Sequence, residues 1–145
     1  MGYKLNLGCG EQKLDGFENL DKPWTFEKGL PYKSGRIEAI TISHALMYVR
    51  EDDYPGVFAE FYRVLRPGGI VRITEDCTDD PKSERFGGYP GATTLTTFEK
   101  MKKYLLGAGF SVRRVSKDTT FFKDQSLLQK IHGDEPRVFF IEGIK

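Results

Sequence analysis

The first part of the chain contains three short apolar runs, and each is stopped by a turn-forming or polar residue. Runs of this length with apolar or β-branched positions predict β-strands. The predicted strands are residues 3–7, 17–20 and 37–42, which end at Gly8, Asp21 and Ser43. Only residues 11–16 separate the first two strands, which leaves room for little more than one helical turn. A crossover between parallel strands usually takes a dozen or more residues, so this connection is unusually short.

Apolar positions that recur every three or four residues predict two amphipathic helices. The first helix is predicted over residues 54–65, with Asp52 or Asp53 as its N-cap. Its apolar face comprises Tyr54, Val57, Phe58, Phe61, Val64 and Leu65. The second helix is predicted from the capping-box pattern formed by Thr96 and Glu99. Its apolar face comprises Phe98, Met101, Leu105 and Ala108.

The second half of the chain predicts further strands and one long loop. The strands are expected at residues 70–74, 110–115 and 138–141, with a short helix near residues 124–131. Residues 77–95 are rich in turn formers and predict a long loop. Strands that alternate with helices favour an α/β sheet of mainly parallel strands. The last two strands lack a full crossover helix, so we expect them to pair antiparallel.

Composition and charge exclude several classes of protein. The 145 residues are 39% hydrophobic and 30% charged, which is typical of a single globular domain, here spanning residues 1–145. No stretch approaches the roughly 18 consecutive apolar residues of a membrane span, and the start does not resemble a signal peptide. The net charge of +1 carries no strong nucleic-acid signature, although residues 100–145 hold 10 basic and 5 acidic residues. Cys9 and Cys77 do not form a disulfide framework, so we expect a reduced, cytoplasmic setting.

The clearest chemical signal is the pair Gly8 and Gly10 directly after the first strand, followed by Asp21 after the second. Glycines let the backbone turn sharply and let a ligand approach it closely. An acidic side chain at the end of the second strand can accept hydrogen bonds from the two hydroxyls of a ribose. The position of a third fingerprint glycine holds Lys13, which disfavours a nicotinamide or flavin dinucleotide. A structural turn at the glycines and a capping role for Asp21 remain the alternatives.

At this point the chain resembles the small class I S-adenosylmethionine-dependent methyltransferases. The likeness lies in five blocks taken in order, which are residues 5–10, 16–21, 30–40, 43–46 and 60–69. The resemblance implies a Rossmann-like, mostly parallel sheet with an antiparallel C-terminal strand and an abbreviated N-terminal half. It also implies S-adenosyl-L-methionine as the cofactor and methyl transfer as the activity.

The resemblance further implies where the cofactor binds. Gly8 and Gly10 would approach its methionine part, and Asp21 would bind its ribose. Trp24 would stack on the face of its adenine, with Glu27 to Leu30 near the adenine edge. The full set implied at the cofactor is Leu7, Gly8, Cys9, Gly10, Asp21, Lys22, Trp24, Leu30, Ser43 and His44. Ordinary core packing is the alternative for Trp24.

The residues also suggest a catalytic group, but they do not identify the acceptor. His44 is the candidate base, because an unperturbed imidazole titrates in the right range. Tyr48 and Asp76 are weaker candidates for acceptor contacts. The family often has Leu-Glu-His where this chain has Leu46-Met47-Tyr48, which removes an acid and a base. The alternative function is therefore a non-catalytic module that binds the cofactor or a partner.

Metal binding and partners complete the expectations. Asp76, Asp79 and Asp80 lack a regular ligand spacing, so we expect a solvated acidic loop and no metal site. The acceptor is unidentified, and a macromolecule or glycan would suit a pocket without a lid. A homo-oligomer or a protein partner is left open, and no membrane association is expected.

Overall fold

The computed structural model describes residues 3–10, 13–22, 24–76, 93–115 and 138–145. Its strands are β1 (Tyr3–Leu7), β2 (Glu18–Leu20), β3 (Ile37–Ser43), β4 (Leu65–Asp76), β5 (Ser111–Val115) and β6 (Val138–Ile144). Its α-helices are α1 (Tyr54–Val64) and α2 (Phe98–Gly107), and its 3-10 helices are η1 (Phe26–Lys28), η2 (Leu46–Tyr48) and η3 (Glu51–Asp53).

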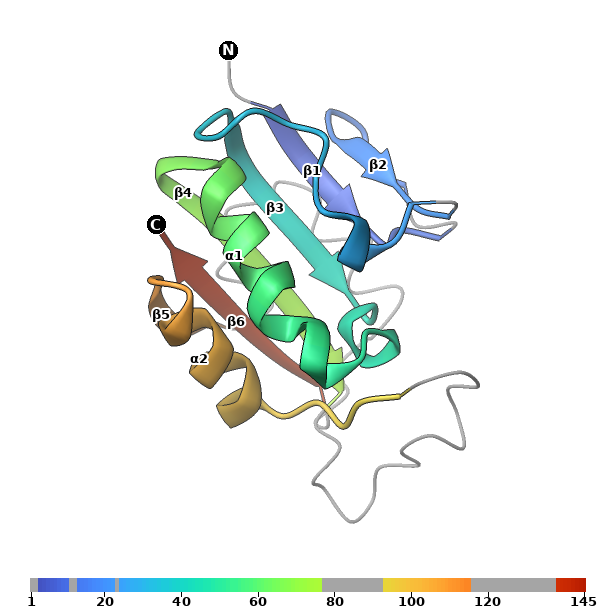
Figure 1. Cartoon of the computed structure of the whole chain (residues 1–145), viewed down its shortest axis with the longest axis vertical. Coiled ribbons are helices and arrows are strands. Elements are labelled where there is room, and N and C mark those ends of the chain that lie inside the picture. The colour runs from blue at the N-terminus through green and yellow to red at the C-terminus, as the bar shows by residue number, and fades with distance from the viewer. Residues whose placement is uncertain (1–2, 11–12, 23, 77–92, 116–137) are drawn as a thin grey trace.

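The strands form one mixed sheet in the order β2-β1-β3-β4-β6-β5. β1 runs parallel to β2 and β3, and β3 runs parallel to β4. β6 runs antiparallel to both of its neighbours, β4 and β5. The predicted fold class is therefore confirmed, including the antiparallel C-terminal strand. Figure 1 shows both α-helices in front of this sheet.

Asn19 organises the short connection between β1 and β2. Its side-chain oxygen accepts hydrogen bonds of 2.9 Å from the amide of Asn6 and from the backbone N–H of Leu14. Its amide nitrogen donates at 3.2 Å to the carbonyls of Leu14 and Phe17. One side chain thus satisfies backbone groups that a longer crossover would satisfy within a helix. The two strands are parallel despite the short link.

The core lies between the sheet and the two α-helices. Side chains alternate between the faces of a strand, so the strand register brings buried aliphatic residues together in rows. One row holds Leu5, Ile40 and Val71, and the next holds Leu7, Ile42 and Ile73, all fully buried. The predicted apolar face of α1 packs against them, and full burial of each such side chain contributes about 1.5–3 kcal/mol.

The opposite face of the sheet carries a buried ion pair. Arg72 and Glu142 are both fully buried, and Nη1 of Arg72 lies 3.3 Å from Oε1 of Glu142. Arg113 approaches the other carboxylate oxygen at 2.6 Å, and the Arg72 guanidinium lies 5.0 Å from the ring centre of Phe140. Buried charges persist only when they are paired and hydrogen-bonded, so this cluster ties β4, β5 and β6 together.

α1 begins at Tyr54 with Asp53 as its N-cap residue, as predicted, whereas the cap of α2 differs from the prediction. Asp53 precedes α1, but its side chain makes no capping hydrogen bond, because η3 already gives it a helical backbone. Pro55 occupies the first turn, where its fixed φ fits. The cap of α2 is Thr97 and not Thr96, since the Thr97 hydroxyl accepts a 3.0 Å hydrogen bond from Lys100.

β4 begins directly after α1 at Leu65, whereas the strand was predicted from residue 70. The register shifts at this point, since Ile37 faces Leu65 while Ala39 faces Ile70. The extra residues form a bulge that brings a backbone oxygen close to Gly69, where a Cβ would lie only 2.8 Å from it. The glycine turn is thus absorbed into the strand.

Several predictions lie outside the described residues. They concern most of the loop at 77–95 with Asp79 and Asp80, the short helix at 124–131, and Cys77. No α-helix within the described ranges has the length and apolar character needed to cross a membrane.

Candidate functional site

A cleft of about 550 Å³ opens where β1, β2 and β3 end. Ligands of open α/β sheets bind at the carboxyl ends of the strands, and the volume suits a small-molecule cofactor. The cleft is lined by Gly8, Gly10, Asp21, Lys22, Trp24, Thr25, Phe26, Glu27, His44, Ala45, Tyr48 and Val49.

Gly8 and Gly10 form the turn after β1, and they serve it in different ways. Both have a positive φ, of 64° and 53°, which favours glycine. A Cβ on Gly8 would lie 2.7 Å from the Cβ of Ala45 and 3.3 Å from the ring of Phe26. A Cβ on Gly10 would meet nothing within 4 Å. Gly8 therefore permits close packing of the walls, and Gly10 leaves its backbone open.

Asp21 stands exposed at the end of β2, and its carbonyl closes a turn by accepting a 3.0 Å hydrogen bond from the N–H of Trp24. Cys9 lies close to it but is buried. Burial, and secondarily the negative charge of Asp21, raise the pKa of the Cys9 thiol. Asp21 thus offers a carboxylate at the cleft, while Cys9 stays a neutral thiol.

Trp24 and Phe26 build an aromatic wall. Their ring centres lie 4.9 Å apart at an interplanar angle of 56°. The indole Nε1 of Trp24 donates a 2.8 Å hydrogen bond to the carbonyl of Gly29, which fixes the ring by its polar edge. An anchored, half-buried indole presents a rigid apolar surface to the cleft.

His44 ends β3 in an unusual conformation. Its φ of 52° lies in the left-handed region, which is uncommon for residues other than glycine and often occurs at functional sites. Its backbone N–H donates a 2.8 Å hydrogen bond to the carbonyl of Thr74. Burial lowers the pKa of His44 to about 4, so the imidazole is neutral near pH 7.

The segment after His44 is clamped by its neighbours. The N–H groups of Ala45 and Leu46 donate to one carboxylate oxygen of Glu75, at 3.1 and 2.8 Å. The hydroxyl of Tyr54 donates a 2.7 Å hydrogen bond to the carbonyl of Leu46. The hydroxyl of Thr94 donates at 2.6 Å to the carbonyl of Val49. This wall of the cleft is therefore rigidly placed.

The cleft brings together six of the residues expected at the cofactor, namely Gly8, Gly10, Asp21, Lys22, Trp24 and His44. The other four do not line it. Leu7, Cys9 and Leu30 are buried, and Leu7 and Leu30 belong to the apolar core. Ser43 precedes the turn at His44, and its register partner is Thr74 of β4. Core packing accounts for the absence of Leu7 and Leu30 from the lining of the cleft.

Three lining residues, Thr25, Phe26 and Val49, had no signal in the sequence, because they lie in segments without helical or strand periodicity. Ala45 also lines the cleft, and it lies within the block at residues 43–46 that carries part of the resemblance. Glu27 and Tyr48, which were expected near the adenine and the acceptor, do line the cleft. Leu46 and Met47 are buried in the structure. In the part of the chain that the structure describes, no group of three His, Cys, Asp or Glu side chains could hold a metal ion.

Comparison with known proteins gives a consistent result. Residues 24–73 match the family described as "Methyltransferase domain". A SAM dependent methyltransferase from Archaeoglobus fulgidus superposes with a TM-score of 0.69 at 13% identity, over 99% of this chain and 86% of that chain. A protein in complex with the Haloferax volcanii Trm112 methyltransferase activator superposes with a TM-score of 0.70 at 14% identity, over 99% of this chain and 81% of that chain. The [4+2]-cyclase SpnF superposes with a TM-score of 0.60 at 18% identity, over 99% of this chain and 74% of that chain.

No curated protein matches the sequence. The structural likenesses show the fold, and the matched segment covers the aromatic wall, β3, α1 and most of β4. The chain therefore has the fold of solved S-adenosylmethionine-dependent methyltransferases, and its residues 24–73 match the methyltransferase domain family.

Proposed function

We propose that this protein binds S-adenosylmethionine in the cleft and transfers its methyl group to an acceptor. The observation that carries the proposal is the meeting of Gly10, Asp21 and His44, each from the end of a different strand, at one cleft. They meet in a chain that matches the methyltransferase domain family.

The cleft fits such a cofactor in three respects. The open backbone at Gly10 leaves room that a side chain would fill. The exposed carboxylate of Asp21 can accept two hydrogen bonds from a ribose. The rings of Trp24 and Phe26 offer an apolar surface on which an adenine can lie. We therefore assign the methionine part to Gly8 and Gly10, the ribose to Asp21 and the base to the aromatic wall.

S-adenosylmethionine, when bound, supplies a sulfonium methyl group that is already activated for displacement. The chain has to orient the acceptor in line and to limit access of water, and such positioning supplies much of the rate acceleration. Trp24, Phe26 and Val49 supply apolar surface for this purpose.

His44 is our candidate for contact with the acceptor. Its lowered pKa keeps the imidazole neutral, so that it can accept a hydrogen bond from a protonated acceptor. The same shift makes it a weaker base than an ordinary histidine, because a general base works best with a pKa near the working pH. We therefore assign His44 mainly to orientation of the acceptor. Tyr48, which is exposed at the cleft, is the second candidate, and the acceptor is taken to be a macromolecule or a glycan.

A non-catalytic binding module is the alternative. It is favoured by the weak basicity of His44. Incubation of the purified protein and methyl-labelled cofactor with fractionated cell extracts separates the two. Label transfer that is lost in Asp21→Ala supports the enzyme. Cofactor binding without label transfer to protein, nucleic acid, glycan or small-molecule fractions favours the module.

A further inference from the structure

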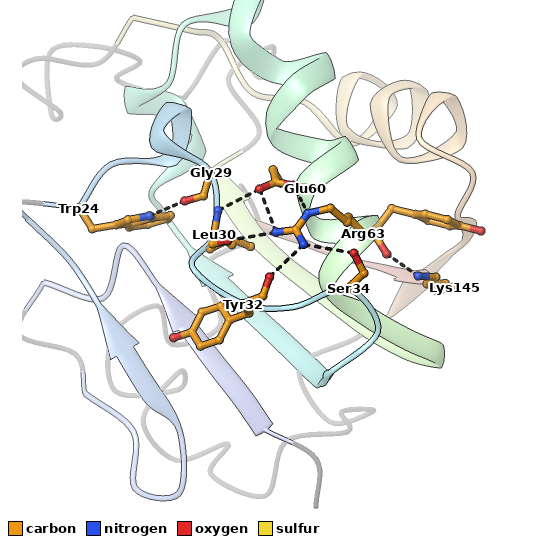
Figure 2. A network of polar contacts seen from close by, with 9 residues as sticks. Trp24, Gly29, Leu30, Tyr32, Ser34, Glu60, Arg63 and Lys145 are labelled. Carbon is orange, nitrogen blue, oxygen red and sulfur yellow. Dashed lines mark hydrogen bonds and ion pairs between the residues drawn. The ribbon is translucent and has the colours of Figure 1, made fainter.

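Two side chains of α1, Glu60 and Arg63, reach from the helix to the chain segment that precedes β3 (Figure 2). They are separated by one helical turn and form an ion pair. Their side chains are 28% and 36% exposed, so the pair is partly shielded from water. The segment that they contact, residues 29–35, has no regular secondary structure.

Glu60 contacts the start of this segment. Its Oε1 accepts a 3.1 Å hydrogen bond from the backbone N–H of Leu30. A Cβ on Gly29 would lie 2.8 Å from the same oxygen, and Gly29 has a φ of 75°. The carboxylate therefore occupies the space that the missing side chain leaves, and it fixes the backbone at Gly29 and Leu30.

Arg63 holds the rest of the segment. Its Nη2 donates at 3.0 Å to the carbonyl of Leu30, and its Nη1 donates at 2.9 Å to the carbonyl of Tyr32 and at 3.2 Å to the hydroxyl of Ser34. The backbone carbonyl of Arg63 accepts a 2.9 Å hydrogen bond from Gly35. A planar guanidinium can reach several acceptors at once, which a lysine ammonium cannot do in the same geometry.

The pair keeps both of its charges. Hydrogen bonding to Arg63 lowers the pKa of Glu60, and the same contact raises the pKa of Arg63. Hydrogen bonds to charged groups are stronger than those between neutral groups, so the pair is well suited to hold a segment without a ladder of its own.

The segment connects directly to the cleft. The carbonyl of Gly29 accepts the hydrogen bond from Nε1 of Trp24. Trp24 packs on Phe26, and Phe26 in turn meets the ring of Phe61 from α1 at a centre-to-centre distance of 6.2 Å. A displacement at Gly29 would therefore reach the aromatic wall through one hydrogen bond and one ring contact.

We infer that Glu60 and Arg63 are positioning residues of the cofactor cleft, which hold the aromatic wall at Trp24 through the backbone of Gly29 and Leu30. Neither side chain lines the cleft, and both act through residues 29–34. The effect on cofactor binding rests on the proposed function, but the effect on Trp24 itself does not.

The test uses two variants of the whole chain. Glu60→Gln retains the shape of the side chain but removes the charge, and Arg63→Lys retains the charge but removes the planar fork. Trp24 is the only tryptophan, so its fluorescence reports the wall without ambiguity. Met101→Ala serves as the control, because Met101 is buried on α2 and does not line the cleft.

We expect both variants to shift the Trp24 emission of the unliganded protein to longer wavelength. We expect about tenfold weaker binding of S-adenosylhomocysteine in calorimetry, well below the unfolding temperature. Met101→Ala should unfold at lower temperature but keep the wild-type emission and affinity. If Glu60→Gln does not fold, the Trp24 emission and the S-adenosylhomocysteine affinity of Arg63→Lys test the inference alone.

Wild-type emission and an affinity within about twofold of wild type in a folded variant would overturn the inference. Lack of cofactor binding by the wild-type protein would instead defeat the proposed function. In that case the emission of the unliganded variants still decides whether the pair positions Trp24.

Discussion

The buried carboxylate of Glu75 accepts a hydrogen bond of 2.8 Å from the backbone N–H of Leu46. The same oxygen accepts a second hydrogen bond from Ala45. A residue at the end of β4 thus fixes the turn after β3, which lines the cleft through Ala45 and Tyr48. The cleft is built by contacts between neighbouring strands as well as by the glycine turn.

Glu75→Leu should lower the free energy of unfolding by about 3 kcal/mol, because it leaves two buried N–H groups without an acceptor. Glu75→Gln keeps one acceptor oxygen and should cost about 1 kcal/mol. Urea denaturation of both variants measures the difference. Equal losses in the two variants would show that Glu75 does not act through these hydrogen bonds.

Gly8→Ala and Gly10→Ala should separate the structural role of one glycine from the binding role of the other. Each places a side chain at positive φ, which costs about 1–2 kcal/mol. Gly8→Ala adds a clash with Ala45 and should cost about 1–3 kcal/mol more. Gly10→Ala should lower the free energy of unfolding by little more than this strain, because its methyl group meets no atom within 4 Å. It should nevertheless weaken cofactor binding, because the methyl group takes up open space at the cleft. Thermal unfolding and calorimetry measure the two effects, and a Gly8→Ala protein no less stable than Gly10→Ala would contradict the packing described.

The neutral His44 should make stability depend on pH. Burial lowers its pKa in the folded state to about 4, from an ordinary value of 6.5. The unfolded chain therefore binds a proton below about pH 6.5 that the folded protein does not bind. The stabilisation is complete above that pH, and it is lost as the pH falls toward 4.

We expect this loss to reach about 2 kcal/mol between pH 7.5 and pH 5. His44→Asn removes the titrating group, and asparagine tolerates a left-handed backbone. Urea denaturation at both pH values measures how much the free energy of unfolding falls between pH 7.5 and pH 5. This fall should be smaller in the variant than in the wild type by about 2 kcal/mol. The same pH dependence in both proteins would mean that His44 titrates normally.

Glu142→Gln should be strongly destabilising, although the two side chains have the same shape. It removes the negative charge beside the fully buried Arg72 and beside Arg113. Loss of one partner of a buried ion pair typically costs about 3–5 kcal/mol. Chemical denaturation measures it, with Glu38→Gln as the control, because Glu38 pairs with Arg66 at 3.8 Å on a more exposed part of the sheet. A similar, small loss in both variants would contradict a stabilising role for the buried pair.

Local patterns predicted those parts of the structure that depend on neighbours in sequence. The glycine turn at Gly8 and the carboxylate of Asp21 follow strands that the apolar runs predicted, and both reach the cleft. The short crossover was predicted from its length, but the part played by Asn19 was not, since its partners are set by the folded turn.

Contacts between distant residues could not be predicted from periodicity. Glu75 meets Leu46 across 29 positions, and Glu60 meets Leu30 across 30. Leu30 was expected at the adenine, yet core packing turns its side chain inward while its backbone binds Glu60 and Arg63. The capping-box pattern favoured Thr96, but Thr96 is fully buried and Thr97 caps α2 instead.

Calorimetric titration of the purified protein with S-adenosylmethionine and with S-adenosylhomocysteine tests the central claim most directly. The wild-type chain should bind either ligand in a one-to-one complex, and Asp21→Ala should bind about tenfold more weakly or not at all. Asp15→Ala is the matched control, because Asp15 is also an exposed aspartate but does not line the cleft, and it should bind as the wild type does. Absence of binding by the folded wild-type protein at millimolar ligand would contradict the assignment of this cleft to the cofactor.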